Sequence, residues 1–506
     1  MIKLIPKEIL EIYNKFQDAG FEVYFVGGCV RNLLMQRAVK DWDFTTDAKP
    51  EQILKLFKDG FYDNKFGTVG IPVILGNRQQ TVTPESLRTL HDVGDSGQSR
   101  MTQKIIVEAT TFRTEHGYSD RRRPDVVKWG KTIEEDLARR DFTVNAIALQ
   151  CHPEPFDLTQ GKLREGSRFA RDSSSASGET QNDRIEIIDP FDGQGDIKNK
   201  IIRAVGDPAL RFKEDALRLI RAIRIATEHG FTIESKTWDE IISDAHLISE
   251  VSGERVRIEV LRIMSSDHPY DGVMLLKNSN LLKNILPELL EGVDVSQARP
   301  GRHHTSDVFT HNILSLKFCP STDPIVRFAT LMHDVGKPKV EKRDEEGLVI
   351  FHNHEIVGAK IVREICDRLR FSRKDRDKIV NLIRWHMFTV DEKITDAAVR
   401  RFIRRVGVES VKDMMDLRIG DRLGGGTQTA ESWRLKLFKK RIEDQLKPAP
   451  FSINDLAVDG NDVMKELNIK PGPKIGKILN KLFEEVDEDL SKNKKEYLLK
   501  RIKELK

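Results

Sequence analysis

Two aspartates separated by one residue lie in the string KDWDFTT at residues 40–46. On a β-strand, this spacing points the carboxylates of Asp41 and Asp43 to the same face. Like charges side by side are destabilising unless a cation lies between them, and Mg²⁺ prefers carboxylate and phosphate oxygens together. Alone, this spacing is usually an Asp pair at a strand edge or turn. Together with a glycine turn a few residues upstream, it predicts a Mg²⁺ site for phosphoryl transfer.

A paired-glycine turn precedes the aspartates, in VGGCVRNLL at residues 26–34. Gly27 and Gly28 lack the Cβ atoms that would keep a polyphosphate away from backbone N–H groups at a helix start. Arg31 can bind the same phosphates through two hydrogen bonds. The alternative for this string is a tight packing turn. A third carboxylate on a neighbouring strand is usual in two-metal phosphoryl transfer, and Glu108 in IIVEATTFR is the best candidate; an exposed strand glutamate is the alternative.

A second set of possible ligands is spread over separate helical segments further along the chain. One part is FATLMHDVGKPK, where an apolar helix runs into an adjacent His-Asp pair. A lone histidine on an apolar face is usually a core residue, but imidazoles combined with carboxylates suit a first-row divalent metal. We therefore predict a second metal site, holding a transition metal or Mg²⁺, at His311, His333, Asp334, His354, His386 and Asp421.

The elements that must position these residues change character along the chain. Residues 21–150 alternate short β-rich runs (21–26, 42–46 and 105–112) with helical runs (30–34, 50–58 and 141–149), which predicts a small α/β head. Two polar segments, 77–104 and 164–184, lack apolar periodicity and indicate surface insertions. From Leu210 onward, apolar residues recur at three- and four-residue spacing, which is typical of helices.

Composition limits the class of protein. The chain has 506 residues, 39% of them apolar, and should form several domains. Its charged fraction is 32%, yet the net charge is only +4, so a nucleic-acid surface must come from local basic patches. Four widely separated cysteines favour a reducing cytoplasm. We find no signal peptide and no apolar stretch of the roughly 20 residues that a membrane span needs.

Six strings follow one another along the chain. They are VGGCVRNLL, KDWDFTT, LARRDFTVNAIAL (137–149), IIDPFDGQGDIKNKIIRAVGDP (187–208), EDALRLIRAIRIA (214–226) and VSGERVRIEVLRIM (251–264). In this order they resemble the motifs of class II tRNA nucleotidyltransferases, the CCA-adding enzymes, and of bacterial poly(A) polymerases. The resemblance covers most of the chain and implies an α/β nucleotidyltransferase head followed by an all-α neck, an HD-type helical domain and a helical tail.

The resemblance implies roles for these motifs. Asp41 and Asp43 would hold the Mg²⁺ ions that activate the RNA 3′-hydroxyl and bind the incoming triphosphate. Gly28 and Arg31 would hold that triphosphate. Contacts with the ribose and phosphates of the nucleotide are implied for Arg140, Asp141 and Asn145.

Base selection is implied for the EDALR string. Asp215 and Arg218 are three residues apart and are therefore expected on one helix face, where the family uses such a pair to bind the Watson–Crick edge of a base. Arg221 and Arg224 continue the stripe toward nucleotide or RNA phosphate. Without the resemblance, this string would be an ordinary charged helix with internal ion pairs.

The sequence departs from the family pattern at Asn32, where an Asp is usual, and at Gln36, where a Gly is usual. We expect weaker local electrostatics and retained activity. The segment 114–136 resembles the flexible loop that enzymes adding only CC tend to lack, and FGTVGI at 66–71 is more similar to CCA-adding than to poly(A)-adding relatives. Both favour addition of the terminal A, although a charged turn is the alternative for the arginines at 121–123.

The second set of ligands resembles the HD phosphohydrolase superfamily, which implies hydrolysis of phosphomonoester or 2′,3′-cyclic phosphate ends by a metal-activated water. An HD fold kept as an RNA-binding scaffold is the alternative. The segment 455–486 resembles the tail of some CCA-adding enzymes. We expect a head at 1–160 with an insertion at 77–104, a disordered insertion at 161–184, a neck for nucleotide selection at 185–300, an HD domain at 301–430 and a helical RNA-binding tail at 431–506.

The resemblance therefore implies an enzyme that adds C, C and A to the 3′ end of tRNA from CTP and ATP. We expect it to be cytoplasmic, without a membrane or an obligate protein partner. A-only addition and poly(A) synthesis are alternatives within the same class. A phosphohydrolase with a nucleotide- or RNA-binding head and a non-catalytic RNA-binding protein are alternatives of other classes.

Overall fold

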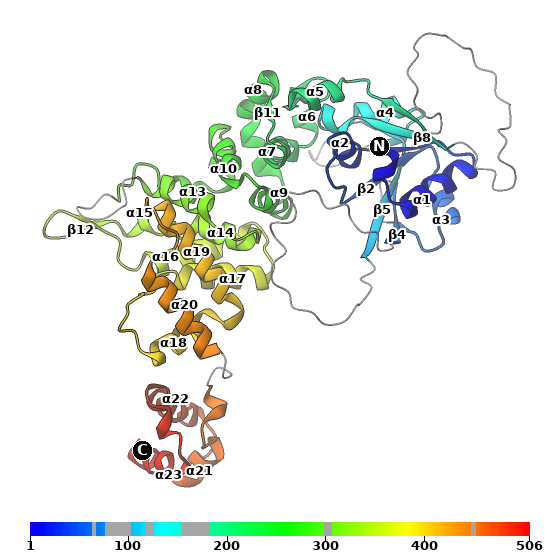
Figure 1. Cartoon of the computed structure of the whole chain (residues 1–506). Helices are drawn as coiled ribbons and strands as arrows, with labels where there is room; N and C mark the ends of the chain where they lie inside the picture. Colours follow the sequence, from blue (N-terminus) through cyan, green and yellow to red (C-terminus); the bar gives the residue numbers. More distant parts are fainter. Residues whose placement is uncertain are drawn as a thin grey trace, which may run out of the picture. The chain divides into compact units, whose positions relative to one another are not determined.

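The computed structural model describes residues 1–62, 67–75, 103–116, 126–153, 183–297, 306–446 and 452–505. The chain forms two compact units, Met1–Val251 and Ser252–Lys506, whose elements are labelled in Figure 1. Most of the predicted insertions, and residues 117–125 of the predicted loop, lie outside the described residues. The finer division into five domains stays a prediction.

The first unit is built on a mixed seven-stranded sheet with the order β3-β4-β5-β2-β1-β8-β9. β2 runs parallel to β5, and the other neighbouring pairs are antiparallel. The sheet strands are β1 (Val23–Val26), β2 (Trp42–Thr46), β3 (Phe61–Tyr62), β4 (Thr68–Leu75), β5 (Gln103–Thr111), β8 (Ala148–Pro153) and β9 (Asp183–Ile188), with a separate hairpin of β6 (Arg113–His116) and β7 (Val126–Trp129).

Helices flank this sheet and continue the unit as a helical region (Figure 1). Two short strands of this unit, β10 (Ile201–Ile202) and β11 (Thr232–Ile233), pair in parallel. An α/β head followed by helices confirms the predicted fold class. The helices are η1 (Ile2–Leu4), α1 (Lys7–Asp18), α2 (Gly28–Leu34), α3 (Pro50–Leu56), α4 (Ile133–Ala138), η3 (Thr143–Asn145), α5 (Gly193–Asn199), α6 (Pro208–Glu214), α7 (Leu217–His229), α8 (Ser235–Asp244) and η4 (Ala245–Glu250).

Alternating residues of the central strands enter two separate hydrophobic clusters. On one face, Phe25 and Phe44 pack with Tyr13 of α1, and the rings of Tyr13 and Phe25 stack with centroids 5.0 Å apart. On the other face, Tyr24 packs in a cluster with residues of α4. Because neighbouring side chains on a strand point to opposite faces, Asp43 lies on the face opposite α1.

Two expectations about the head are wrong in detail. Residues 141–149 form no α-helix; they form the short 3-10 helix η3 and the start of β8, because tertiary pairing overrides the local pattern. The N–H of Thr143 donates to the carbonyl of Arg203 at 3.0 Å, and Ala148 pairs with Val26 of β1. The insertions are also shorter than predicted, because residues 103–104 belong to β5 and residues 183–184 to β9.

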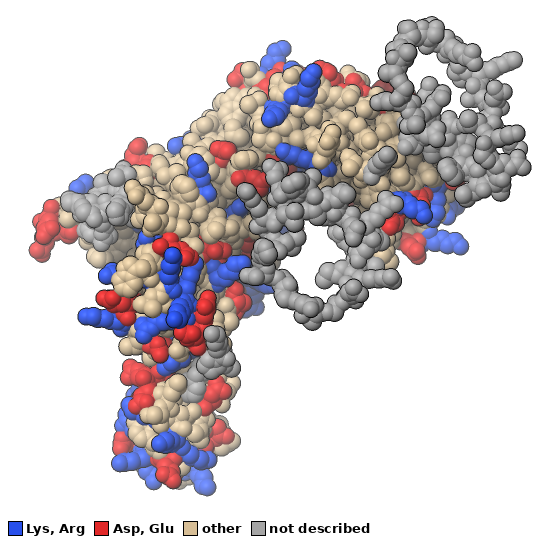
Figure 2. Space-filling view, viewed as in Figure 1, with Lys and Arg blue, Asp and Glu red and all other residues tan. Residues whose placement is uncertain are grey.

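The second unit is helical, as predicted, apart from the pair β12 (Lys342–Arg343) and β13 (Val349–Ile350). On the face shown in Figure 2, its Lys and Arg side chains are interspersed with Asp and Glu. Across the described residues of both units, every helix is too short or too polar to cross a membrane. The first helices of this unit are α9 (Gly253–Ser265), α10 (Pro269–Asn278), α11 (Leu281–Ile285), α12 (Pro287–Leu290), α13 (Val308–Phe318), α14 (Pro324–Met332), α15 (Lys337–Val340), α16 (His354–Arg368) and α17 (Arg373–Trp385).

The last three helices of the chain share a hydrophobic cluster of their own. This tail is anchored by a buried carboxylate: Asp487 accepts hydrogen bonds from Arg400 at 2.8 Å and from Arg404 at 2.5 Å. An ion pair with two buried or half-buried arginines fixes one geometry of tail on body. The remaining helices are α18 (Asp396–Val406), η5 (Val408–Ser410), α19 (Val411–Gly424), α20 (Trp433–Leu446), η6 (Ile453–Asp455), α21 (Gly460–Leu467), α22 (Pro473–Glu488), η7 (Leu490–Lys492) and α23 (Lys495–Glu504).

Candidate active site and candidate metal centre

Three carboxylates lie on or next to one face of the head sheet. Asp43 of β2 is in register with Glu108 of the parallel strand β5, and Asp41 directly precedes β2. The neighbours of Asp43 and Glu108 on their strands are buried on the α1 face, so both carboxylates point to the opposite face. Burial raises the pKa of Asp43, the charge of Arg140 opposes this rise, and Asp41 adds to it. The raised pKa reflects a charge that a divalent cation would stabilise.

The glycine turn brings the arginine of the third motif to this face. Gly27 has φ of 74°, in the left-handed region that favours glycine. A Cβ atom there would lie 3.0 Å from Nη1 of Arg140 and 3.6 Å from Oδ2 of Asp43. The turn therefore lets Arg140 approach the carboxylates closely. At Gly28, a Cβ atom would lie 3.5 Å from Nη2 of Arg31, so both glycines adjoin a guanidinium.

A chain of buried polar contacts joins three of the predicted motifs. Arg31 donates to Oδ1 of Asn145 at 2.6 Å, and Nδ2 of Asn145 donates to Oδ1 of Asp141 at 3.1 Å. The other oxygen of Asp141 accepts from Nε of Arg221 at 2.8 Å. Burial, assisted by the charge of Arg224, lowers the pKa of Arg31 to about 10. The result is a fixed row of two guanidiniums, one amide and one carboxylate beside the face with Asp43, and its guanidiniums suit an anionic ligand.

The base-selecting pair is arranged differently from the prediction. Asp215 is not on the helix with Arg218: it is the extended residue between α6 and α7, and its Oδ1 accepts from the N–H of Leu217 at 3.1 Å. The break arises because this cap satisfies the first turn of α7. Arg218 donates to Glu214 at 2.6 Å and to two backbone carbonyls, which holds its guanidinium in place. Arg224 donates to Glu228 at 2.7 Å.

The structure shows what replaces the usual residues at the two departures from the family pattern, Asn32 and Gln36. Oδ1 of Asn32 accepts from Nε and Nη2 of Arg31 at 3.3 and 3.2 Å, and its Nδ2 donates to the carbonyl of Ala38 at 3.4 Å. Asn32 thus retains a contact with the arginine without a negative charge. Gln36 has φ of 53°, the conformation for which glycine is preferred.

Sequence reasoning missed Asp136, which positions the arginines of the third motif. This fully buried carboxylate accepts from Arg139 at 2.6 Å and from Arg140 at 3.2 Å. Burial disfavours its charge, but the two arginines outweigh this effect and lower the pKa. The spacing of three and four residues in EEDLARR was the available signal, because side chains at these separations meet on a helix.

Comparison with known proteins places these features in a family. Residues 23–164 match the Poly A polymerase head domain, residues 230–292 the "probable RNA and SrmB-binding site of polymerase A", and residues 341–502 the putative domain 2 of tRNA nucleotidyltransferases. The A-adding tRNA nucleotidyltransferase of Deinococcus radiodurans is 34% identical over 373 residues, covering 71% of this chain and 76% of that protein. The chain belongs to the tRNA nucleotidyltransferase and poly(A) polymerase family.

Other relatives of this nucleotidyltransferase extend over its whole length. The CCA-adding enzyme of Pediococcus pentosaceus is 28% identical over 502 residues, covering 98% of this chain and 96% of that protein. The crystal structure of the Bacillus stearothermophilus CCA-adding enzyme with CTP shares the fold, with a TM-score of 0.62, 22% identity and coverage of 98% and 96%.

The second unit of the nucleotidyltransferase brings all six predicted HD residues together. Two groups of three form, His311–His333–Asp421 and Asp334–His354–His386, each with ligand atoms within 4.8 Å of one another. Oδ2 of Asp334 lies 3.3 Å from Nε2 of His311 and of His333, while Oδ1 lies 3.2 Å from Nε2 of His354. Asp334 therefore faces both groups, and its two oxygens could each serve as a metal ligand.

The histidine rings are oriented by backbone carbonyls. Nδ1 of His333, His354 and His386 contacts the carbonyls of Thr330, Phe351 and Ile383, respectively, at 2.7–2.8 Å. An N–H on Nδ1 leaves Nε2 as the free lone pair, the tautomer that binds metal. Burial opposes protonation of His333, but Asp334 and Asp421 outweigh it and raise its pKa to about 10. A metal that binds Nε2 of His333 would therefore displace a proton from the ring.

Close packing through glycines assembles this cluster. A Cβ atom on Gly424 of α19 would lie 2.4 Å from Oγ of Ser315 on α13, so glycine lets the helix with Asp421 pack against the helix with His311. A Cβ atom on Gly336 would lie 2.2 Å from the carbonyl of His354. Sequence reasoning missed Lys337, whose Nζ lies 2.5 Å from Oδ2 of Asp334; its position three residues after Asp334 was the signal.

Replacement of Asp141 by asparagine is expected to lower the free energy of unfolding at pH 7 by about 1.5–3 kcal/mol, the range for hydrogen bonds to charged groups. Burial opposes the charge of Asp141, but Arg221 and Asn145 outweigh it and hold the pKa below its usual range. This contribution is complete above the unfolded pKa of about 3.9 and is lost as the pH falls through the folded pKa.

Urea unfolding of wild type and Asp141→Asn at pH 7 and pH 3.5 measures this effect. The free energy of unfolding should differ less between wild type and Asp141→Asn at pH 3.5 than at pH 7. The control Asp18→Asn, on the exposed end of α1, should unfold with nearly the wild-type free energy at either pH. An equal difference for Asp141→Asn at both pH values would mean that its charge contributes nothing.

Proposed function

We propose that this chain adds C, C and A to the 3′ end of tRNA, using CTP and ATP. The observation that carries the proposal is the row Arg31–Asn145–Asp141–Arg221 beside a face with Asp43. Relatives that align over almost the whole chain are named CCA-adding enzymes, and solved structures of similar fold contain CTP, ATP or tRNA.

Divalent metal dependence is a property of the family, and we propose Mg²⁺ for this head. Asp41, Asp43 and Glu108 offer oxygen ligands, as Mg²⁺ requires, and burial of the Asp43 charge favours a cation beside it. When bound, Mg²⁺ supplies Lewis-acid stabilisation of phosphate charge and acidifies the attacking hydroxyl. Asp41 and Asp43 would hold it, with Glu108 beside them on β5.

The neighbouring side chains would orient the nucleotide. Gly27 and Gly28 leave room for the triphosphate against the turn, and Arg31 and Arg140 would offset its charge. Asn145, held between Arg31 and Asp141, would contact the ribose. These groups are fixed by their own hydrogen bonds, so little reorganisation accompanies binding.

Base selection would fall to Asp215 and Arg218. Arg218 uses its two Nη groups on Glu214 and backbone carbonyls, which leaves its Nε–H without a partner among the described residues. Arg221 and Arg224 would offset phosphate charge. An amino-acid template of this kind needs rigid donors, because a donor that moves freely does not discriminate between bases.

A panel of three tRNAs tests this function. They end before the CCA, after CC, and at the complete CCA, and each is offered CTP or ATP separately. CCA addition predicts two added nucleotides with CTP on the first, one with ATP on the second, and none on the third. Addition of A to the second with no CTP incorporation would support A-only activity, which the 34% identity to the Deinococcus A-adding enzyme favours. Long A products would indicate poly(A) synthesis.

For the second unit, we propose a two-metal phosphohydrolase acting on phosphomonoester or 2′,3′-cyclic phosphate ends. Support comes from the convergence of four imidazoles and two carboxylates in a buried cluster. The nitrogen ligands favour a first-row transition metal over Mg²⁺. An RNA-binding scaffold without hydrolysis remains the other outcome of the test below. We infer a cytoplasmic location from the four cysteines, which are buried and unpaired.

A further inference from the structure

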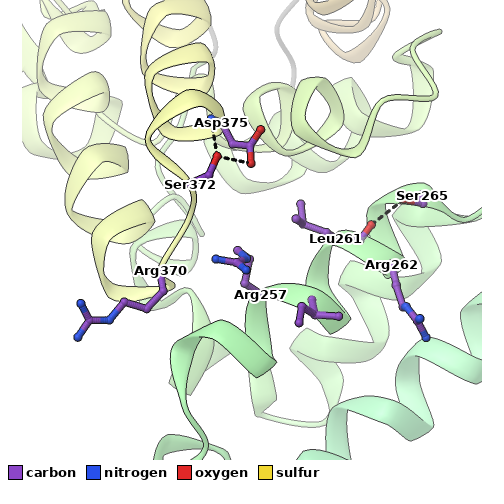
Figure 3. A pocket seen from close by; sticks show the side chains of 8 residues that line it. Arg257, Leu261, Arg262, Ser265, Arg370, Ser372 and Asp375 are labelled. Atoms are coloured by element: carbon purple, nitrogen blue, oxygen red, sulfur yellow. Dashed lines mark hydrogen bonds between the residues drawn. The ribbon is translucent and has the colours of Figure 1, made fainter. Parts of the chain in front are cut away.

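A groove of about 530 Å³ lies on the second unit, outside both sites described above. One wall is α9, and the other is the turn between α16 and α17 with the start of α17 (Figure 3). Ile258, 44% exposed, and Leu261 give it an apolar floor. Three arginines and one aspartate line it, so its lining carries a net positive charge: Arg257, Arg262, Arg370 and Asp375.

Two of the three arginine charges in the groove have no counter-charge within the described part of the chain. Within the described residues, neither the guanidinium of Arg262 nor that of Arg370 has an ion-pair or hydrogen-bond partner. Arg257 lies 3.8 Å from Glu254. Asp375 is engaged with Ser372, which donates to its carboxylate at 2.7 Å.

Other arginines near this groove are paired. Arg368 lies 2.6 Å from Glu288, and Arg376 lies 3.0 Å from Asp367. Two unpaired guanidiniums therefore lie in the lining of the groove, where an external anion can bind them.

The arrangement fits an extended polyanion better than a single phosphate. Figure 3 shows the three arginines spread along the groove, with Arg257 between the two walls and the side chains of Arg262 and Arg370 pointing in different directions. A single phosphate would need converging donors. Guanidiniums spaced along an open channel, with aliphatic side chains between them, suit the successive phosphates and riboses of a nucleic-acid backbone.

We propose that this groove binds the sugar–phosphate backbone of the tRNA substrate, away from the 3′ end, and thereby positions the tRNA. The proposal rests on the function proposed above. The match to a probable RNA-binding region ends at residue 292, so it includes the α9 wall but not the wall with Arg370. A protein partner at the same groove is the competing occupant, and the test separates the two.

The test measures binding of fluorescent tRNA lacking its CCA by anisotropy at several salt concentrations. The variant Arg257→Ala/Arg262→Ala/Arg370→Ala should bind at least about tenfold more weakly at 0.15 M salt. Its plot of log affinity against log salt should be shallower by about 2, since each lost phosphate contact removes roughly 0.7–0.9. The KM for tRNA should rise similarly, whereas the KM for CTP should stay within about twofold.

Two further variants control for charge and folding. Arg257→Lys/Arg262→Lys/Arg370→Lys keeps the charges and should keep most of the salt dependence. Lys342→Ala/Lys360→Ala/Lys393→Ala removes three exposed charges outside the groove and should change affinity much less. The proposal is contradicted if the variant with alanine at the three groove arginines binds tRNA like wild type, as expected for a groove that binds a protein. It is also contradicted if Lys342→Ala/Lys360→Ala/Lys393→Ala loses as much affinity as that variant. Failure of wild type to extend any tRNA would refute the proposed function instead.

Discussion

Asp43→Asn is expected to lower kcat for CTP incorporation into tRNA lacking its CCA by at least about 10³-fold. The substitution keeps the size of the side chain and removes the charge that faces Asp41 and Glu108. Loss of one metal-binding carboxylate removes several kcal/mol of transition-state stabilisation, and about 4 kcal/mol corresponds to that factor. Asp41→Asn should have an effect of similar size.

Single-turnover incorporation measured by gel electrophoresis provides the readout, with Asp59→Asn, an exposed residue after α3, as the control. The control should retain wild-type rates. Glu108→Gln distinguishes the third carboxylate from an exposed strand glutamate: a metal-binding role predicts a loss of about tenfold or more, and an exposed glutamate predicts none. Near-normal kcat in Asp43→Asn would refute the metal assignment.

For the metal centre proposed in the second unit, Asp334→Ala is expected to reduce the bound first-row metal from about two ions per chain to none. Asp334 is the carboxylate that faces both groups of ligands, so its loss should empty both positions. Metal content measured by mass spectrometry, and hydrolysis of 2′,3′-cyclic phosphate ends, should fall together. Nucleotide incorporation should remain within about twofold of wild type, because its site lies in the first unit.

The matched control is Asp391→Ala, an exposed aspartate on the loop after α17. It should retain metal and hydrolysis. If Asp334→Ala loses its metal but wild type hydrolyses no phosphate ends, the second unit is an RNA-binding scaffold and not a hydrolase. Collapse of nucleotide incorporation in folded Asp334→Ala would contradict the independence of the two sites, and His333→Ala with Asp334→Ala provides a second version of the same test.

The sequence predicted those parts of the site that depend on local patterns. The DxD spacing on a strand placed Asp43 correctly, and the apolar neighbours of Glu108 placed it on an adjacent strand. The spread of histidines over helices predicted a cluster that the fold does assemble. Each of these inferences used a period of two or 3.6 residues, or a residue type whose chemistry is restricted.

Features that depend on distant contacts were not predictable in this way. Residues 141–149 have a helical pattern, yet their partners are Arg203 and β1, far away in the sequence. Asp215 leaves the helix because it caps the next one. The contact of Arg31 with Asn145 joins residues 114 positions apart, and no spacing rule indicates it.

The length of the extended tRNA is the most direct test of the proposed CCA addition. Purified protein with Mg²⁺, CTP and ATP together is offered tRNA ending before the CCA, and the product is measured by mass spectrometry. We expect extension by C, C and A, after which addition stops. An unextended tRNA, or a product that carries only A residues, would contradict it.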